Sequence, residues 1–303
     1  MNRYWIALLS LALTAGIGNS AEEAVPDLIA ANAFYYYEDV ERAHEFYRDT
    51  LGLETVIDYG FAKIMRITTG SYVTVVDAEL GMHSADEPKT ITLSLVTDEL
   101  DAWRRYLEGR ELALEERMPD DGAWPGRVVI ADPEGYLLVF VENAPEHSMF
   151  AGLEPVATKV PSEEPLMIRA GVFSAYFEDL AKLDGFYERL LGVAPAGELD
   201  GAVLLQVALG GFVGLVDGGD HLHEPTTENG FTLSFFTNDV DAWFTRAAAS
   251  PGLELRTEEV VSESGRVSVF VGYDPTGKFL EWDTFLDIEE NETLLRYLEQ
   301  EPP

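Results

Sequence analysis

The chain has 303 residues, with 20 lysine and arginine residues against 55 aspartate and glutamate residues, so its formal net charge at pH 7 is −35. Hydrophobic residues make up 47% of the chain, which is enough for a packed core and excludes a disordered acidic tail protein. The absence of cysteine excludes a disulfide framework, a thiolate nucleophile and a cysteine-ligated metal. Because the charge repels phosphates and anionic lipid, we expect neither nucleic acid nor a membrane surface as a partner, whereas a cationic ligand would be attracted.

The first residues have the pattern of a secretory signal peptide. Arg3 is the single charged side chain before an apolar run at 6–17, and small residues follow up to Ala21, ahead of two glutamates. The apolar run is too short to cross a bilayer, which takes about 20 residues. We therefore expect residues 1–21 to be removed during export, and the mature protein to be periplasmic or secreted, with no membrane attachment.

The rest of the chain contains an internal repeat of one module. Three ordered segments recur, the first two at an offset of 140 residues and the third at an offset of 142. They are 43–53 with 183–193, 92–103 with 232–243, and 132–135 with 274–277. We therefore divide the chain into a signal peptide at 1–21, a first module at 30–143, a linker at 144–166, a second module at 167–286 and an acidic tail at 287–303.

Hydrophobic periodicity predicts the elements of each copy. In chain order, the first copy predicts a strand at 34–37, a helix at 40–51, a β-hairpin of 62–68 and 71–77, a strand at 91–96, a helix at 99–107 and two strands at 128–131 and 136–142. The second copy repeats this, with its first helix at 180–191. Both first helices follow an acidic cap and end at a glycine, as helices commonly do. A short helix is also expected in the tail, at 289–298.

Three motifs resemble those of the vicinal oxygen chelate superfamily, which includes glyoxalase I, extradiol dioxygenases and the fosfomycin- and bleomycin-resistance proteins. They are "DVERAHEFYRDTLGLE" over the first helix, "TDELDAW" at the second helix and "DPEGYLLVFVE" at the end of the module. The resemblance covers residues 32–142 and 168–285. It implies an α+β fold of tandem βαβββ modules, with two pseudo-symmetric domains whose sheets curl around a cleft.

The resemblance also implies where a metal would be held. In metal-dependent members, the ligands are His or Gln on the first strand, His on the strand before the second helix and Glu on the last strand. These positions correspond to Asn32, Thr92 and Val139 in the first copy and to Val172, Thr232 and Glu281 in the second. Only Glu281 is a usual ligand. We therefore expect these six residues to line a cleft that needs no cofactor, with a divalent metal as the alternative.

Glu281 is the candidate catalytic residue. Phe279, Glu281 and Asp283 share one face of the last predicted strand, because side chains alternate along a strand. If that face lines the cleft, burial should raise the pKa of Glu281, and its carboxylate could act as a general base. The alternative is a carboxylate that accepts a hydrogen bond from Thr232 or is hydrated at the mouth of the cleft.

The five histidines do not complete a metal site at these positions. His44 lies on the first predicted helix, where we expect it to face solvent. His83 and His223 occupy one repeat position in a loop, while His147 lies in the linker and His221 two residues before His223. A loop histidine is usually hydrogen-bonded or solvated, so the recurrence of His83 and His223 is a candidate signal and no more.

Three functions remain open. The first is an exported protein that binds a small organic ligand, cationic or aromatic, in its cleft without a catalytic metal, as a monomer or homodimer. The second is a glyoxalase-like lyase or isomerase, or a dioxygenase, which uses Glu281 as a general base or as a metal anchor. The third is a structural or interaction protein with a vestigial cleft.

Overall fold

The computed structural model describes residues 25–110, 112, 126–145, 147–162, 165–218 and 222–299. The predicted signal peptide and His221 lie outside the described residues.

The first copy contains β1 (Ala30–Tyr37), α1 (Val40–Glu45), β2 (Glu54–Asp58), β3 (Ala62–Arg66), β4 (Ser71–Asp77), β5 (Ile91–Thr97), α2 (Leu100–Gly109), β6 (Arg127–Ala131) and β7 (Leu137–Glu142). The second copy contains β10 (Ala170–Phe177), α3 (Phe186–Leu191), β11 (Pro195–Leu199), β12 (Ala202–Ala208), β13 (Gly211–Asp217), β14 (Phe231–Phe236), α4 (Val240–Ala249), β15 (Glu254–Leu255), β16 (Val261–Glu263), β17 (Val267–Tyr273) and β18 (Phe279–Phe285). The short strands β8 (Val156–Ala157) and β9 (Met167–Ile168) pair between the copies, and α5 (Glu292–Leu298) ends the described chain.

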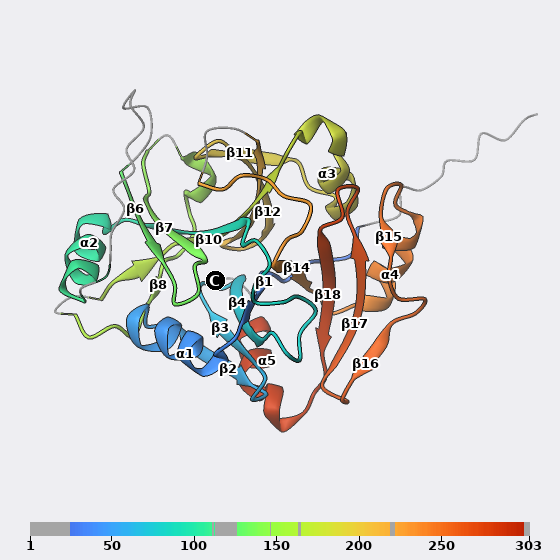
Figure 1. Cartoon of the computed structure of the whole chain (residues 1–303), viewed down its shortest axis with the longest axis horizontal. Coiled ribbons are helices and arrows are strands. Elements are labelled where there is room, and N and C mark those ends of the chain that lie inside the picture. The colour runs from blue at the N-terminus through green and yellow to red at the C-terminus, as the bar shows by residue number, and fades with distance from the viewer. Residues whose placement is uncertain are drawn as a thin grey trace, which may run out of the picture.

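The two large sheets are each built from one half of each copy. Sheet A has the order β15-β17-β18-β14-β1-β4-β3-β2, with β16 beside β17, and sheet B has the order β11-β12-β13-β10-β5-β7-β6. The halves join where β1 pairs antiparallel with β14 and where β10 pairs antiparallel with β5 (Figure 1). The predicted α+β class with two repeated modules is confirmed.

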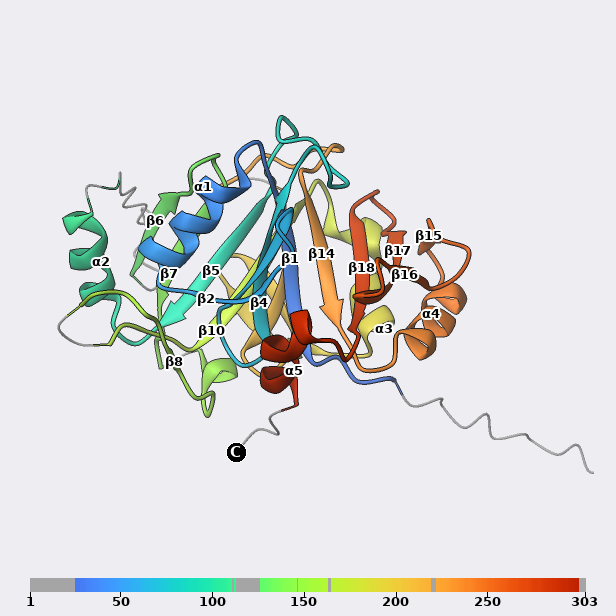
Figure 2. The same cartoon turned by 90° about the horizontal axis from the view of Figure 1, so that it is seen from below.

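The sheets meet back to back, with helices filling the space where they diverge. Alternate side chains of β1, such as Ala33 and Tyr35, share a buried core with Phe173 of β10 and Trp103 of α2. Figure 2 shows α1 and α2 on one flank and α3 and α4 on the other. The backbones come closest at Gly211, where an added Cβ would lie 1.9 Å from a carbonyl oxygen of the other sheet. The opposite, concave face of each sheet therefore points away from this core.

Several local predictions were wrong, and two of them have a clear physical reason. First, β2 and β11 were missed, because these edge strands mix polar and apolar residues without regular alternation. Second, the helix predicted at 180–191 is broken into a 3-10 turn at 180–183 and α3. Asp184 and Gly185 separate the two with φ angles of 45° and 67°, a left-handed conformation that an α-helix cannot continue through.

Each concave face is partly covered by a segment outside the repeats. On sheet A, α5 packs Leu294 against Tyr72, Phe236 and Phe285, so the predicted tail helix forms and covers one end of the face. On sheet B, the linker contributes Phe150 and Leu153 to a different apolar cluster. None of the described helices is long and apolar enough to span a bilayer.

We predict that Leu294→Ala lowers the free energy of unfolding by about 2–4 kcal/mol, because Leu294 is fully buried on sheet A and the change leaves a cavity. Urea denaturation measures this. Glu292→Ala, an exposed position on the same helix, serves as the control and should change stability by less than about 0.5 kcal/mol. Equal, small effects of both variants would show that α5 does not stabilise the sheet.

Candidate functional site

The six predicted cleft positions fall on the concave faces, but not in the groups that the copies suggested. Sheet A holds Asn32, Thr232 and Glu281, and sheet B holds Thr92, Val139 and Val172. The three positions of one copy therefore do not share a face. The reason is the exchange of halves, which puts the first strand of one copy beside the later strands of the other.

A polar row crosses the concave face of sheet A. Asn32 on β1 is the register partner of Ser234 on β14, which is in turn the partner of Glu281 on β18. Neighbouring strands lie about 4.8 Å apart, so the row spans roughly 10 Å. Ser234 was not among the predicted site residues. Thr232 lies one pair further along, opposite Phe34, and its hydroxyl bonds to Tyr36 rather than to Glu281.

Two carboxyl groups stand together at one end of this row. Asp283 follows Glu281 on the same face of β18; Asp283 is 3% exposed, and Glu281 is partly exposed. Ser234 Oγ donates a hydrogen bond to Asp283 Oδ2 at 2.5 Å. Burial raises the pKa of Glu281 well above its ordinary value, and the negative charge of Asp283 raises it further. Burial also raises the pKa of Asp283, to about 7. The pair therefore retains a proton near neutral pH.

The other end of the row carries an unused hydrogen-bond donor. Asn32 is 1% exposed, and its Oδ1 accepts a hydrogen bond from Thr74 Oγ1 at 3.0 Å. The Nδ2 group of Asn32 has no hydrogen-bond partner among the described residues. A buried amide donor without a partner costs free energy, so this position is suited to an acceptor on a ligand.

A cluster of rings closes the same face beyond Glu281. Tyr36 Oη lies 2.9 Å from Thr232 Oγ1. The ring of His83 lies edge-on to Tyr36, at 5.0 Å between centroids, and to Phe279, at 4.9 Å. His83 Nδ1 is 2.7 Å from Glu87 Oε2. The loop that follows β4 thus places His83 over the end of the concave face.

Sheet B repeats this framework with different side chains in the row. Tyr176 Oη lies 2.9 Å from Thr92 Oγ1, and its ring is 5.1 Å from that of His223. However, Val172 and Val139 occupy the positions of Asn32 and Glu281, and both are buried in one apolar cluster that includes a phenylalanine of the linker. The duplicated fold therefore carries a polar face on sheet A and an apolar, covered face on sheet B.

The expectation that His44 faces solvent is wrong. His44 is 6% exposed, and its Nε2 lies 2.7 Å from Thr55 Oγ1. Thr55 belongs to β2, the strand that the sequence did not predict, and α1 lies against this strand. Burial lowers the pKa of His44, so the ring stays neutral at pH 7 and has a structural role.

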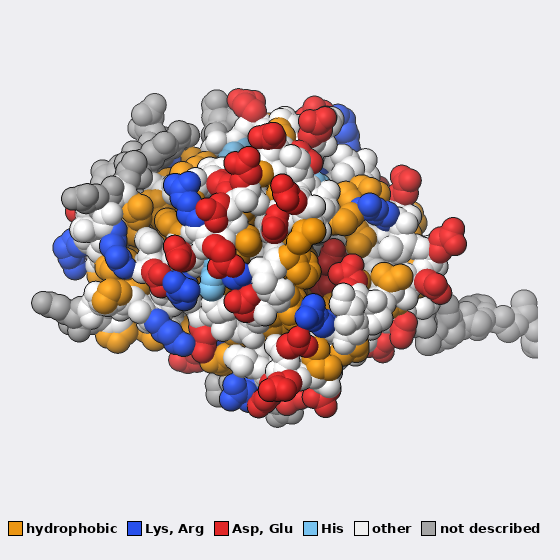
Figure 3. Space-filling view, turned by 60° about the horizontal axis from the view of Figure 1, so that its bottom comes forward, with side chains coloured by type: hydrophobic (Ala, Val, Ile, Leu, Met, Phe, Trp, Pro, Cys, Tyr) orange, Lys and Arg blue, Asp and Glu red, His pale blue; other side chains and the backbone are white. Residues whose placement is uncertain are grey.

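The space-filling view shows a hollow to the right of its centre, with acidic atoms in its depth between hydrophobic side chains (Figure 3). This agrees with a carboxyl pair on the concave face of sheet A, flanked by the apolar side chains of β17 and β18. A ligand that enters the hollow would meet carboxyl groups at its base and aromatic rings on its walls.

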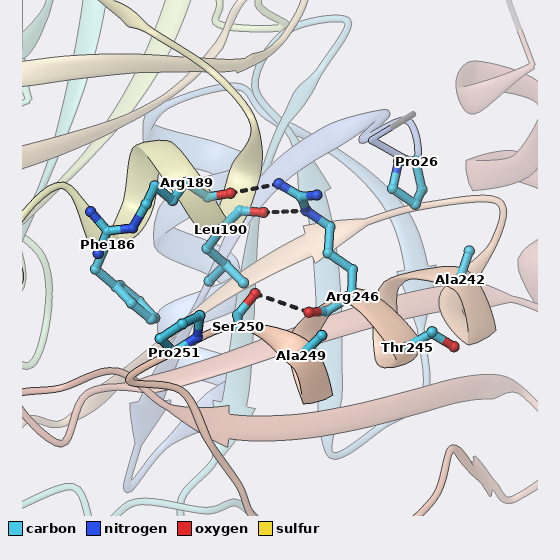
Figure 4. Close-up of a pocket in the computed structure, with 10 residues that line it drawn as sticks. All are labelled: Pro26, Phe186, Arg189, Leu190, Ala242, Thr245, Arg246, Ala249, Ser250 and Pro251. Atoms are coloured by element: carbon cyan, nitrogen blue, oxygen red, sulfur yellow. Dashed lines mark hydrogen bonds between the residues drawn. The ribbon is translucent and has the colours of Figure 1, made fainter. Parts of the chain in front are cut away.

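A separate cavity of about 450 Å³ lies between α3 and α4 (Figure 4). Arg246 reaches across it from α4, and donates through Nε to the carbonyl oxygen of Leu190 and through Nη2 to that of Arg189. These bonds satisfy carbonyl groups at the end of α3 that no helical N–H can reach. The guanidinium therefore ties the two helices together, and none of the predicted site residues lines this cavity.

Part of the chain matches a known family, and its fold resembles that of solved structures. Residues 29–140 match the family described as the Glyoxalase/Bleomycin resistance protein/Dioxygenase superfamily. The fold resembles that of a proposed dioxygenase from Bacillus subtilis, with a TM-score of 0.60, 16% identity and 91% of each chain covered. It also resembles glyoxalase I from Zea mays, with a TM-score of 0.57, 14% identity, and 90% of this chain and 95% of that chain covered. No curated protein matches the sequence.

We predict that the double variant Glu281→Gln with Asp283→Asn gains stability relative to the wild type as the pH rises from 4.5 to 7.5. In the folded wild type the pair has raised pKa values, so the folded state binds more protons than the unfolded state in this range, and its stability falls with rising pH. The amides cannot ionise, so the variant lacks this loss. Urea denaturation at several pH values measures the difference; parallel pH profiles would show that the carboxyl groups are not desolvated.

Proposed function

We propose that the concave face of sheet A is a ligand cleft and that the protein binds a small organic cation there, a proposal supported by the match of residues 29–140 to the glyoxalase, bleomycin-resistance protein and dioxygenase superfamily. The observation that carries this proposal is the carboxyl pair of Glu281 and Asp283. Among the described residues, neither carboxyl group is paired with a basic side chain. A buried acidic pair without a counter-cation is a site where an organic cation would be stabilised.

Electrostatics favour a cation beside the ionised member of the pair. Since the pKa of Asp283 is about 7, ionising it at neutral pH costs little. A cation about 4 Å from the carboxylate would gain roughly 4 kcal/mol at an effective dielectric constant of 20. Phe34 and Tyr36 on β1 lie on the same face and offer rings for cation–π contacts, whereas the guanidinium of Arg256 already lies over the ring of Phe279, 5.2 Å from its centroid.

The residues at the metal positions of the superfamily do not fit its usual ligand set. The first position is Asn32, whose Oδ1 already accepts a hydrogen bond from Thr74. The second presents the hydroxyl groups of Thr232 and Ser234, and both are engaged, with Tyr36 and Asp283 respectively. The described residues contain no group of three or more His, Cys, Asp or Glu side chains that could hold a metal. We therefore propose binding without a catalytic metal.

We expect 2-phenylethylammonium to raise the melting temperature of the protein, and the isosteric alcohol 2-phenylethanol and the anion phenylacetate to raise it much less, because only the amine pairs with the carboxylates. Glu281→Gln should weaken amine binding by at least tenfold, which isothermal titration calorimetry measures. The matched control is Glu263→Gln, which removes an exposed charge near the pair without changing the concave face.

Two results would contradict this proposal. Equal shifts of the melting temperature by the amine, the alcohol and the anion would show that the site does not select a cation. No shift with any of them would favour a structural or interaction protein. About one Zn, Mn, Fe or Ni per purified chain, lost in Glu281→Gln, would overturn the metal-free site and favour a metal-dependent enzyme.

A second function is favoured by the partial exposure and raised pKa of Glu281. A carboxylate whose pKa is raised by burial is a stronger base than an ordinary glutamate and can remove a proton from a bound substrate, as a glyoxalase-like lyase or isomerase requires. This function predicts hydrogen exchange at a C–H group of the bound molecule in D₂O. Exchange by the wild type that is absent in Glu281→Gln would establish it, whereas binding without exchange leaves the binding function.

We also propose that the protein is exported, since residues 1–21 have the signal-peptide pattern. Expression of the full chain in a bacterium should give a protein in the periplasm or the medium whose intact mass lacks the first 20 or 21 residues. A full-length mass in the cytoplasm alone would contradict export, and it would leave the ligand site unaffected.

A further inference from the structure

We propose that His83 contacts the ligand of sheet A through Nε2, and that the ligand is therefore a primary or secondary ammonium, which has N–H groups to donate, rather than a quaternary one. This inference rests on the proposed cation site at Glu281 and Asp283, and it adds a residue and a ligand class that the superfamily motifs do not contain.

The loop that carries His83 is fixed over the concave face. It leaves β4 with Ala78 N–H donating to the carbonyl oxygen of Tyr37, and its far end is held by Gly230 N–H donating to the carbonyl oxygen of Pro88. Between these points, Gly81 lies against Tyr36 so closely that an added Cβ would be 2.6 Å from the ring. The position of His83 is therefore set by the backbone and does not depend on a free-swinging side chain.

Glu87 determines which ring nitrogen of His83 carries the proton. Glu87 Oε2 lies 2.7 Å from Nδ1, while Oε1 accepts a hydrogen bond from the N–H of Ser84. A carboxylate can only accept at this position, so Nδ1 is the protonated nitrogen and Nε2 of the neutral ring offers a lone pair. Burial lowers the pKa of His83 in spite of Glu87, which keeps the ring neutral at pH 7.

The Nε2 acceptor is buried without a partner at the edge of the proposed site. His83 is 9% exposed, and its Nε2 has no hydrogen-bond partner among the described residues. The ring contacts Tyr36 and Phe279, and Phe279 lies two residues before Glu281 on the same face of β18. A buried acceptor costs free energy until a donor reaches it.

The chemistry of the face then defines the ligand. His83 Nε2 and the carboxyl pair are hydrogen-bond acceptors on the same face, so a ligand with N–H groups can donate to Nε2, while a quaternary ammonium has only its charge and its contact with the rings. Asn32 Nδ2, at the other end of the row, is suited to a carbonyl or hydroxyl group on the same molecule. We infer an amine with an acceptor group at its far end.

The second module supplies a matched control. In the first module, His83 packs on Tyr36, whose hydroxyl group is hydrogen-bonded to Thr232. In the second module, His223 packs on Tyr176, whose hydroxyl group is hydrogen-bonded to Thr92. The position of Glu281 is valine in this module, within an apolar cluster on the concave face. A change at His223 should therefore leave cation binding unaffected.

The test compares the affinities of 2-phenylethylammonium and its N,N,N-trimethyl derivative by calorimetry, with the mature full chain. The wild type should prefer the primary amine by about tenfold, the size of effect expected for a hydrogen bond to a charged group. His83→Phe keeps a ring and loses the acceptor, so it should bind the primary amine about tenfold more weakly and the trimethyl derivative equally well. His83→Gln restores an acceptor and should recover most of the affinity, and His223→Phe should match the wild type.

Wild-type affinities for both amines in His83→Phe would overturn the role of His83 and leave the carboxyl site standing. If neither the wild type nor Glu281→Gln binds either amine, the proposed function would instead be overturned. If His83→Phe does not fold, Glu87→Ala decides, since it leaves the ring and removes the acceptor that fixes the tautomer. A reduced preference for the primary amine in that variant supports the inference, and an unchanged preference overturns it.

Discussion

The pairing of β1 with β14 is the constraint on which the site depends. Six consecutive register pairs, from Ala30 with Phe236 to Tyr35 with Phe231, fix the first copy against the second. The segment before β1 is held as well, because the carbonyl oxygen of Asp27 accepts hydrogen bonds from the indole N–H of Trp243 and from the hydroxyl group of Thr237. A shift by one residue would turn Asn32 toward the core and break the polar row, since the side-chain period of a strand is two. The site is therefore a property of the joined copies and not of either copy alone.

The same backbone arrangement in sheet B shows what the side chains add. In sheet B, the register partners across the face are Phe212, Val172, Ser94 and Val139. The corresponding residues of sheet A, in the same order, are Tyr72, Asn32, Ser234 and Glu281. Apolar groups from the linker can cover an apolar row at no desolvation cost. Covering the carboxyl pair in the same way would cost desolvation free energy, unless a charged or hydrogen-bonding partner came with it. Duplication thus produced two faces of one geometry, and the identity of a few residues decides which of them can hold a charged molecule.

The sequence predicted the repeat, most elements and the shared face of Glu281 and Asp283, because these follow from local periodicity. It did not predict the exchange of halves, and the reason is physical. The strands that could pair with β1 are nearly identical, Thr92-Leu93-Ser94-Leu95 in one copy and Thr232-Leu233-Ser234-Phe235 in the other, so no local signal distinguishes them. Ser234 was missed as a consequence, since its place beside Glu281 exists only in the assembled sheet. His83 was signalled by its recurrence as His223, but its partner Glu87 and its contact with Phe279 depend on the fold.

The two kinds of negative charge in this protein act over different distances. The net charge of −35 concentrates cations around the molecule, but at physiological ionic strength this field is screened beyond about 8 Å. It therefore affects how fast a cation arrives and says little about which cation stays. The carboxyl pair on sheet A is desolvated, so salt screens its charge only weakly. Under the proposed function, selectivity would therefore depend on the geometry of Glu281, Asp283 and the residues facing them, and it would persist at salt concentrations that abolish the attraction of the surface.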